Sequence, residues 1–172
     1  MQAMKIAVRA VAMPPESSIV HLYAGSNLAD AYAVDLPHQQ ARQMAMDSLA
    51  RHVLGSQPGW AQSLMTVRDA IVQPFGIKTA KQLAAHPAGR IGIFRIYAVG
   101  DDEIIVGEDD SHLDFRLSLL RKRQEGQYGS ITMSSVVHCH NKVGRAYIAM
   151  IKPFHKLIVQ RSLVRAVRGG FS

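Results

Sequence analysis

One segment of the chain alternates strictly between polar and apolar residues: His112-Leu113-Asp114-Phe115-Arg116-Leu117-Ser118-Leu119. Successive side chains of a β-strand point to opposite faces, so this period of two predicts a strand with Phe115 and the leucines facing a core. The segments 90–99, 103–108 and 130–139 are also typical of strands, and the predicted turns between them include Gly100-Asp101-Asp102 and residues 121–129. Four strands joined by short turns predict an antiparallel meander.

Upstream of the meander the pattern predicts one strand followed by two helices. Alternation in residues 30–36 ends at Pro37 and predicts a short strand. The first helix has Ala41, Met44, Ala45, Leu49 and Val53 at helical spacing and ends at Gly55, and the second carries Trp60, Leu64, Val67 and Ile71 on one face before Pro74 and Gly76. Residues 1–27, interrupted by Pro14-Pro15 and by Gly25-Ser26-Asn27, are predicted to form an arm that packs on the body.

A long helix is predicted after the meander, with Asn141 as its N-cap. Its apolar stripe consists of Val143, Tyr147, Met150, Ile151, Phe154, Leu157 and Ile158. Pro153 lies within this stripe and should kink the helix, because proline lacks the N–H that would bond the carbonyl of Ala149. Beyond Gln160 the phase slips, which predicts a bent or separate last piece.

The length and composition of the chain indicate which class of protein it belongs to. The chain has 172 residues, of which 48% are hydrophobic, and this is typical of one folded domain, here expected over residues 28–172 behind the arm. The single cysteine, Cys139, excludes an internal disulfide framework. Because no apolar run approaches the length of a membrane span, we expect a soluble, cytoplasmic protein.

The net charge of +7 is unevenly placed. Residues 1–125 carry 13 basic and 13 acidic residues, whereas residues 126–172 carry seven basic residues and no acid. Such asymmetry is compatible with nucleic acid, a membrane surface, an anionic ligand or a merely solvated helix face. Aromatic residues make up only 6% of the chain, and none is expected to be interleaved with the basic residues on an exposed face, which disfavours nucleic-acid binding.

The predicted order of one strand, two helices, antiparallel strands and a long helix resembles the helix-grip fold of START lipid-transfer domains and polyketide cyclases. The segments Pro58-Gly59-Trp60, 64–69, 107–116, 141–147 and Pro153-Phe154-His155 resemble a bacterial group, the family catalogued as domain of unknown function 2867. The resemblance implies an α+β domain in which a curved antiparallel sheet wraps the long C-terminal helix around a ligand cavity. The family has no established activity, and its reductase fusions imply no cofactor here, because this chain lacks a G-x-G-x-x-G motif.

The run His138-Cys139-His140 could suggest a metal site or a reactive thiol. Two histidines two residues apart on a strand lie about 6.5–7 Å apart, and no third ligand follows at a readable spacing. We therefore expect no metal, although His112 on a neighbouring strand or His155 on the helix could supply a third ligand. Cys139 lies close to a predicted helix start, but the alternation directs it toward the core, which favours an inert buried thiol.

Three hypotheses for function remain open. The first is the binding of a small apolar or amphipathic molecule between sheet and helix, with the cavity lined by Trp60, Phe115, Tyr147 and Phe154 and with Arg145 and His155 as polar anchors. The second is an enzyme of the cyclase, isomerase or hydrolase kind that uses His112, Asp114 or His155 as acid or base. The alternative for His112, Asp114 and Arg116 is a solvent-facing salt-bridge set. The third is nucleic-acid binding. In the first two hypotheses the kink at Pro153 widens the mouth of the cavity beside His155.

Overall fold

The computed structural model describes residues 6–36, 39–55, 89–123 and 129–169, together with Thr66, residues 69–70 and 72–77, Thr79 and Gln82. Trp60, Leu64, Val67 and Ile71, the predicted apolar face of the second helix, lie outside the described residues.

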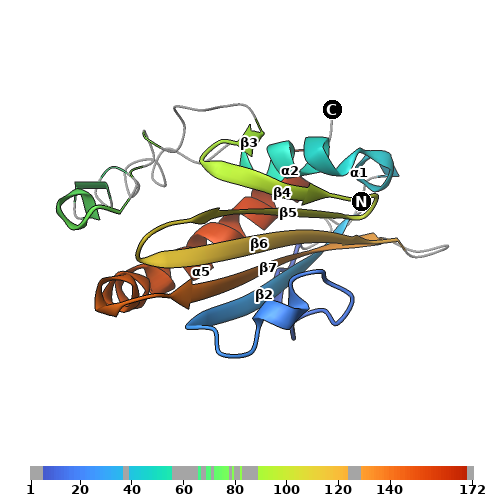
Figure 1. Cartoon of the computed structure of the whole chain (residues 1–172). Helices are drawn as coiled ribbons and strands as arrows, with labels where there is room; N and C mark the ends of the chain where they lie inside the picture. The colour runs from blue at the N-terminus through green and yellow to red at the C-terminus, as the bar shows by residue number, and fades with distance from the viewer. Residues whose placement is uncertain are drawn as a thin grey trace.

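The described part of the chain is an α+β structure in which one open antiparallel sheet carries a long helix on one face (Figure 1). Across the sheet the strands run in the order β1 (Arg9–Ala10), β2 (Leu28–Leu36), β7 (Gly129–Cys139), β6 (Leu113–Lys122), β5 (Glu103–Asp109), β4 (Phe94–Val99) and β3 (Arg90–Ile91). Every neighbouring pair is antiparallel. The predicted meander and the fold class are confirmed, and the arrangement is consistent with a helix-grip fold.

Two details of the meander differ from the prediction. The expected strand 90–99 is a hairpin, because the two-residue loop between Ile91 and Phe94 contains Gly92 at φ 59°, a conformation that glycine adopts without steric cost. The expected turn 121–129 begins too early, because β6 continues to Lys122 and Arg121 is 3% exposed within it.

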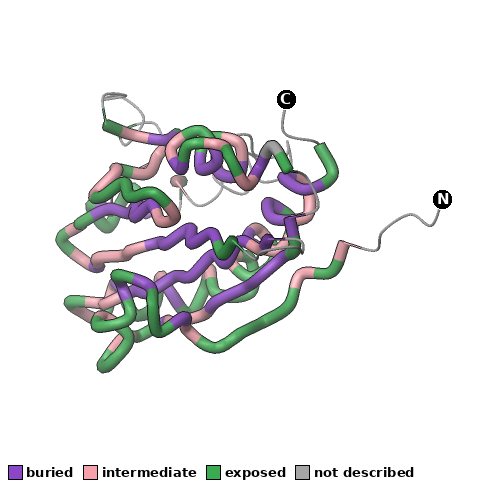
Figure 2. Tube along the Cα trace, turned by 90° about the vertical axis from the view of Figure 1, so that its right-hand side faces the viewer, coloured by how far each residue is buried: buried purple, intermediate pink, exposed green. Residues whose placement is uncertain are grey.

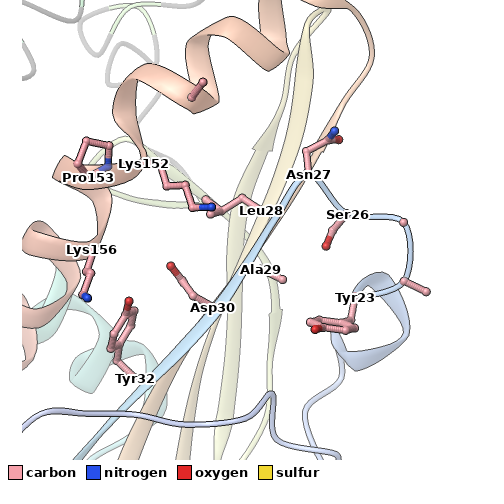
Figure 3. Close-up of a pocket in the computed structure, with 13 residues that line it drawn as sticks. Tyr23, Ser26, Asn27, Leu28, Ala29, Asp30, Tyr32, Lys152, Pro153 and Lys156 are labelled. Carbon is pink, nitrogen blue, oxygen red and sulfur yellow. The ribbon is translucent and has the colours of Figure 1, made fainter.

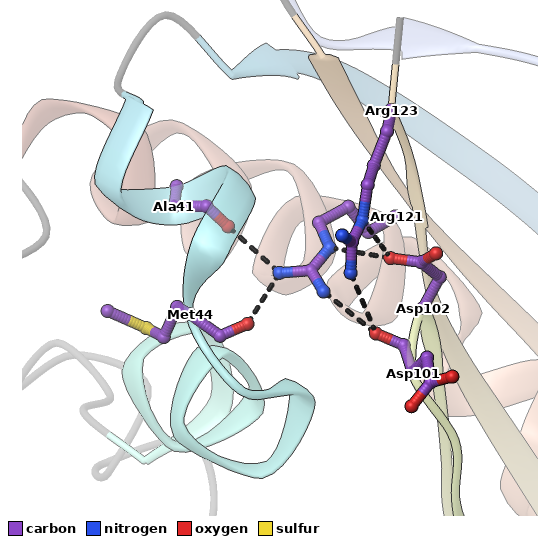
Figure 4. Close-up of polar contacts among 6 residues, drawn as sticks. All are labelled: Ala41, Met44, Asp101, Asp102, Arg121 and Arg123. Carbon is purple, nitrogen blue, oxygen red and sulfur yellow. Dashed lines mark hydrogen bonds and ion pairs between the residues drawn. The ribbon is translucent and has the colours of Figure 1, made fainter.

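The predicted first helix is divided into α1 (Gln39–Gln43) and α2 (Met46–Leu54). A distant residue binds the junction: Nη1 of Arg121 donates to the carbonyls of Ala41 and Met44 at 3.1 and 2.5 Å (Figure 4). Its Nη2 donates to the Asp101 carbonyl at 2.8 Å and its Nε to Asp102 Oδ1 at 3.0 Å. Arg121 thus ties the junction of the two helices to the start of β5 and satisfies carbonyls that the break exposes.

The core lies between one face of the sheet and the helices α2 and α5. Val34, Leu36, Leu117, Leu119, Ile131 and Met133 on the sheet pack with Leu49 and Val53 of α2 and with Val159 and Leu163 of α5. Figure 2 shows buried residues along the central strands and exposed residues in many of the connections.

The C-terminal helix α5 runs without interruption from Lys142 to Arg168, so the predicted break near residue 160 is wrong. Asn141 caps it as predicted, since its Oδ1 accepts a hydrogen bond from the Gly144 N–H at 3.0 Å. The sheet-facing stripe is Gly144, Ile148, Val159, Leu163 and Val167, with half-buried Ile151 and His155 between them. Met150, Phe154 and Leu157 of the predicted stripe are exposed instead, because they lie on the side of the helix turned away from the sheet.

The N-terminal segment lies against the other face of the sheet, where Glu103 binds it. Oε1 of Glu103 accepts from the hydroxyls of Ser17 and Ser118, both at 2.6 Å, and Oε2 accepts from the Ser18 hydroxyl at 2.5 Å. Burial opposes ionisation, but these hydrogen bonds prevail and hold the pKa of Glu103 below its ordinary value. The segment then passes through the short 3-10 helix η1 (Val20–Leu22). The division of the chain into an arm over residues 1–27 and a domain over residues 28–172 stays a prediction.

Candidate functional site

A cavity of about 730 Å³ lies at the edge of the sheet, between β2, the loop that precedes it and the middle of α5 (Figure 3). It is lined by Tyr23, Ala24, Gly25, Ser26, Asn27, Leu28, Ala29, Asp30, Tyr32, Ala149, Lys152, Pro153 and Lys156. We call it the edge cavity. Its size falls in the range of about 300–1,000 Å³ that is usual for small-molecule sites.

The wall formed by β2 is open because its neighbour β1 is short. Strand pairing with β1 reaches only Tyr32 and Ala33, and the last hydrogen bond on this edge joins the Val11 N–H to the Ala31 carbonyl at 2.9 Å. The first residues of β2 therefore border the edge cavity rather than a further strand.

The loop that forms the second wall is fixed by Asn27 and Gly25. The Oδ1 atom of Asn27 accepts from the Cys139 N–H at 2.7 Å, and its own N–H donates to the Val137 carbonyl at 2.8 Å. Gly25 turns the loop at φ 75°. This wall is consequently held to the end of β7 by both the side chain and the backbone N–H of Asn27.

The third wall is the part of α5 around Pro153. Figure 3 shows Pro153 where the ribbon of α5 changes direction, and the first turns of α5 are seen nearly end-on in Figure 1 whereas the rest runs diagonally. Proline offers no N–H to the carbonyl of Ala149, one turn earlier, and both residues line the edge cavity. The bend and the cavity thus occur at the same place on the helix.

The charges at the edge cavity are of both signs. Lys152 and Lys156, one turn apart on α5, are directed toward β2 in Figure 3, where Asp30 and Tyr32 project toward the helix. Asp30 Oδ1 lies 3.4 Å from Nε2 of His155, and both side chains are 21% exposed. In the described part of the chain neither lysine has an ion pair. Burial, helped by the charge of Asp30, raises the pKa of Tyr32.

This arrangement suits one kind of ligand. Leu28, Tyr32 and Pro153 offer apolar surface, and the two ammonium groups offer positive charge beside it. A molecule with an apolar body and an anionic group matches both features. The imidazole of His155, hydrogen-bonded to a carboxylate, is in addition a chemically competent proton carrier.

The predicted ligand-binding residues are distributed over several places. His155 reaches the edge cavity through Asp30. Phe115 and Tyr147 pack in a small cluster with Leu28, which also lines the cavity. Arg145 is exposed on the first turn of α5, and Phe154 is 46% exposed on the outer side of the helix. Phe115, Arg145, Tyr147 and Phe154 do not line the edge cavity, and Trp60 lies outside the described residues.

The residues His112, Asp114 and Arg116 do not form a charged trio. Arg116 pairs with Asp109 at 2.7 Å and stacks over the ring of Tyr97. Asp114 Oδ2 lies 2.9 Å from Nε2 of His140. The alternative, a solvent-facing salt-bridge set, describes the pairs formed by Arg116 and Asp114 better than a trio does.

His112 has both ring nitrogens engaged in structural hydrogen bonds. Because Asn141 Oδ1 accepts from the Gly144 N–H, its Nδ2 group is the donor to Nδ1 of His112, at 2.8 Å. The opposite nitrogen, Nε2, then carries the proton and donates to the carbonyl of Phe75 at 2.6 Å. Through these contacts, His112 connects the start of α5 with the segment around Phe75.

The run 138–140 has three separate environments. His138 donates through Nε2 to the Leu22 carbonyl at 2.7 Å, and His140 contacts Asp114. Burial raises the pKa of the Cys139 thiol, against the opposing charge of Arg145, so the thiolate is disfavoured. Among the described residues, no three His, Cys, Asp or Glu side chains converge on a point where a metal could bind.

The residues that shape the edge cavity were largely missed from the sequence, although a signal existed. Asp30 occupies a core-facing position in the alternation that ends with Tyr32, Val34 and Leu36, and a carboxylate at such a position is unusual. Lys152 and Lys156 flank Pro153 at helical spacing. Nothing in the sequence indicated that β1 would leave part of β2 uncovered.

A family model described as Protein of unknown function (DUF2867) matches residues 22–162, and the chain belongs to this family. The match includes every residue that lines the edge cavity. No curated protein and no solved structure matches the chain. None of the helices in the described residues is long and apolar enough to cross a membrane.

Proposed function

We propose that this member of the DUF2867 family binds a small amphipathic molecule in the edge cavity, with its anionic group at Lys152 and Lys156. The observation that carries the proposal is the coincidence of a cavity of about 730 Å³ with the bend at Pro153 and with two lysines lacking ion pairs within the described chain. The apolar part of the ligand would lie against Leu28, Tyr32 and Pro153.

Asp30 determines which part of the edge cavity can accept the anionic group of the ligand. Its carboxylate would repel an anion placed next to it, so the anionic group should bind at the lysine ammonium groups, with the apolar body against Leu28, Tyr32 and Pro153. The contact with His155 keeps the carboxylate on the helix-facing side of β2.

A second function, an acid–base enzyme working in the same cavity, is favoured by the Asp30–His155 contact alone. A carboxylate that accepts a hydrogen bond from an imidazole is a common way to orient a proton-transferring histidine. His112, in contrast, has both nitrogens occupied by structural partners.

Titration with decanoate, monitored by calorimetry, tests the binding proposal. Decanoate carries one carboxylate on an apolar chain, and decanol serves as the uncharged comparison. We expect saturable binding of decanoate that weakens about tenfold or more in the double variant Lys152→Gln/Lys156→Gln. The matched control, Arg161→Gln/Arg168→Gln, removes two exposed charges of the same helix outside the cavity and should leave the affinity unchanged. Equal loss in both double variants would contradict the proposal.

His155→Gln separates the two functions. Glutamine retains a polar contact to Asp30 but carries no titratable proton. If the protein only binds its ligand, decanoate affinity in this variant stays within about twofold of the parent protein. An enzyme would lose turnover of a converted substrate while keeping the affinity for it.

A further inference from the structure

The outer side of α5 joins exposed apolar side chains to a high density of positive charge. Met150, Phe154 and Leu157 are 38%, 46% and 40% exposed, and their spacing of four and three residues places them on one stripe. We call this stripe the α5 ridge. Phe154 was expected to line a cavity, and the ridge is therefore a feature that the proposed function does not use.

The charge of the helix has one sign only. All seven basic residues of the last quarter of the sequence lie within α5, and the helix contains no aspartate or glutamate. Lys142, Arg145 and Arg161 are exposed, and so are Lys152 and Lys156, which line the edge cavity. Exposed cations thus lie at both ends of the ridge, with Lys142 and Arg145 before it and Arg161 after it.

The positions of Lys142 and Arg145 argue that these charges serve an anionic partner. Both lie in the first turn of α5, where the helix dipole favours acidic residues and disfavours cations. Solubility alone would be served equally well by acids at this end of the helix. Figure 1 shows the first turns of α5 reaching past the ends of β6 and β7, so they are accessible from outside the sheet.

We propose that the outer side of α5 binds the surface of an anionic phospholipid bilayer, with the α5 ridge inserted among the lipids and the flanking cations at the headgroups. An amphipathic helix with a basic polar side and an apolar stripe that contains Phe or Leu lies in the membrane interface in this way. Long basic side chains place their charges at the headgroups while their stems cover apolar surface. A nucleic acid would complement the charge but would leave Met150 and Leu157 without an apolar partner.

The test is co-sedimentation of the full chain with vesicles of phosphatidylcholine alone or with about 30% phosphatidylglycerol. We expect binding at least tenfold tighter to the anionic vesicles, and loss of most of it at about 0.5 M salt, where charges are screened over a few ångströms. Equal binding to both vesicles, or none, would overturn the proposal.

Two variants separate the contributions. Met150→Ser/Phe154→Ser/Leu157→Ser should weaken vesicle binding about tenfold, and its matched control is Val99→Ser, which changes a side chain that is 55% exposed on β4. Lys142→Glu/Arg145→Glu should abolish binding, whereas Arg95→Glu, exposed on the same strand as Val99, should reduce it far less. Circular dichroism melting identifies any variant that fails to fold. Lys152 and Lys156 are unchanged in all of them, so decanoate binding reports separately on the edge cavity.

The same variants show whether a partner other than a membrane binds the α5 ridge. If duplex DNA binds as tightly as the anionic vesicles and the triple serine variant binds both normally, the partner is a nucleic acid and the proposal is wrong. If the parent protein dimerises and the triple serine variant does not, a second copy covers the ridge, and the proposal is again wrong.

Discussion

Asp30 of β2 and His155 of α5 face each other with 3.4 Å between Oδ1 and Nε2, in an interface that is otherwise formed mainly by apolar side chains. The contact lies two residues after Pro153, beside the edge cavity. It joins the bent part of α5 to the strand whose edge borders the cavity, so the Asp30 carboxylate is held toward the helix at the site.

The charge of Asp30 should weaken the binding of anions. Replacing Asp30→Asn removes a negative charge near Lys152 and Lys156 but preserves the size of the side chain, so decanoate affinity should rise about two- to fivefold, as expected for a partly solvated charge pair. Calorimetry at low salt measures this change in decanoate affinity. Asp35→Asn, on the same strand but exposed on the other face, is the control, and a similar gain there would refute a local effect.

Glu103 should make the protein sensitive to acid. Its pKa is lowered in the folded state by hydrogen bonds from Ser118, Ser17 and Ser18, so it stabilises the fold above its unfolded pKa of about 4.3 and loses this contribution as the pH falls through its folded value. Glu103→Gln should lower the free energy of unfolding at pH 7 by about 1–3 kcal/mol and flatten the loss of stability below about pH 4.3. Urea unfolding midpoints of the parent protein and the variant, measured across this pH range, test the prediction. If both lose stability equally steeply toward acid pH, the prediction is wrong.

Arg121 should be far more important than its neighbour Arg123, although both contact Asp102. The Arg121 side chain is 2% exposed and serves three backbone carbonyls, whereas that of Arg123 is 55% exposed. Arg121→Met should cost about 3 kcal/mol or more because it leaves buried acceptors without donors. Arg123→Met should cost less than about 1 kcal/mol. Equal losses in denaturant unfolding would contradict this assignment.

Gly144 is required by the close approach of α5 to the start of β6. A Cβ atom added there would lie 2.1 Å from the carbonyl oxygen of His112, a backbone atom that cannot move aside alone. Gly144→Ala should destabilise the protein by about 1–3 kcal/mol, the usual cost of overpacking. At Gly100 the nearest atom is 3.5 Å away, so Gly100→Ala should be nearly neutral. Thermal melting compares the two, and a tolerated Gly144→Ala would show that the helix can shift.

Pro153 should favour ligand uptake at some cost in stability. Pro153→Ala restores the N–H that bonds the Ala149 carbonyl and should straighten α5, which raises the melting temperature slightly and weakens decanoate binding. A variant with unchanged affinity would show that the bend does not shape the cavity.

The sheet could be predicted from the sequence because alternation is a local signal. In β6, buried Leu113, Leu117 and Leu119 occupy the predicted side, while Ser118 on the other side is buried beneath the N-terminal segment. The separation of α1 from α2 could not be predicted in this way. Its junction is bound by Arg121, 77 residues away in the sequence from Met44, and no local pattern indicates such a contact.

The limits of periodicity are clearest in α5. Met150, Phe154 and Leu157 have the spacing of a core stripe, but spacing cannot show whether another element covers them, and in the fold they face outward. The edge cavity was missed for a related reason. It exists because β1 is short and because Pro153 bends the helix opposite the uncovered part of β2. The bend at Pro153 could be predicted from the sequence, but the shortness of β1 could not.

The central claim, that the edge cavity binds an amphipathic anion, is tested most directly by mapping amide chemical shifts during a decanoate titration. The account predicts saturable shifts concentrated at Asn27–Asp30 and at Ala149–Lys156, with little change at Glu103 or Arg121 on other parts of the sheet. Shifts that concentrate elsewhere, or no saturable shift up to millimolar decanoate, would contradict it.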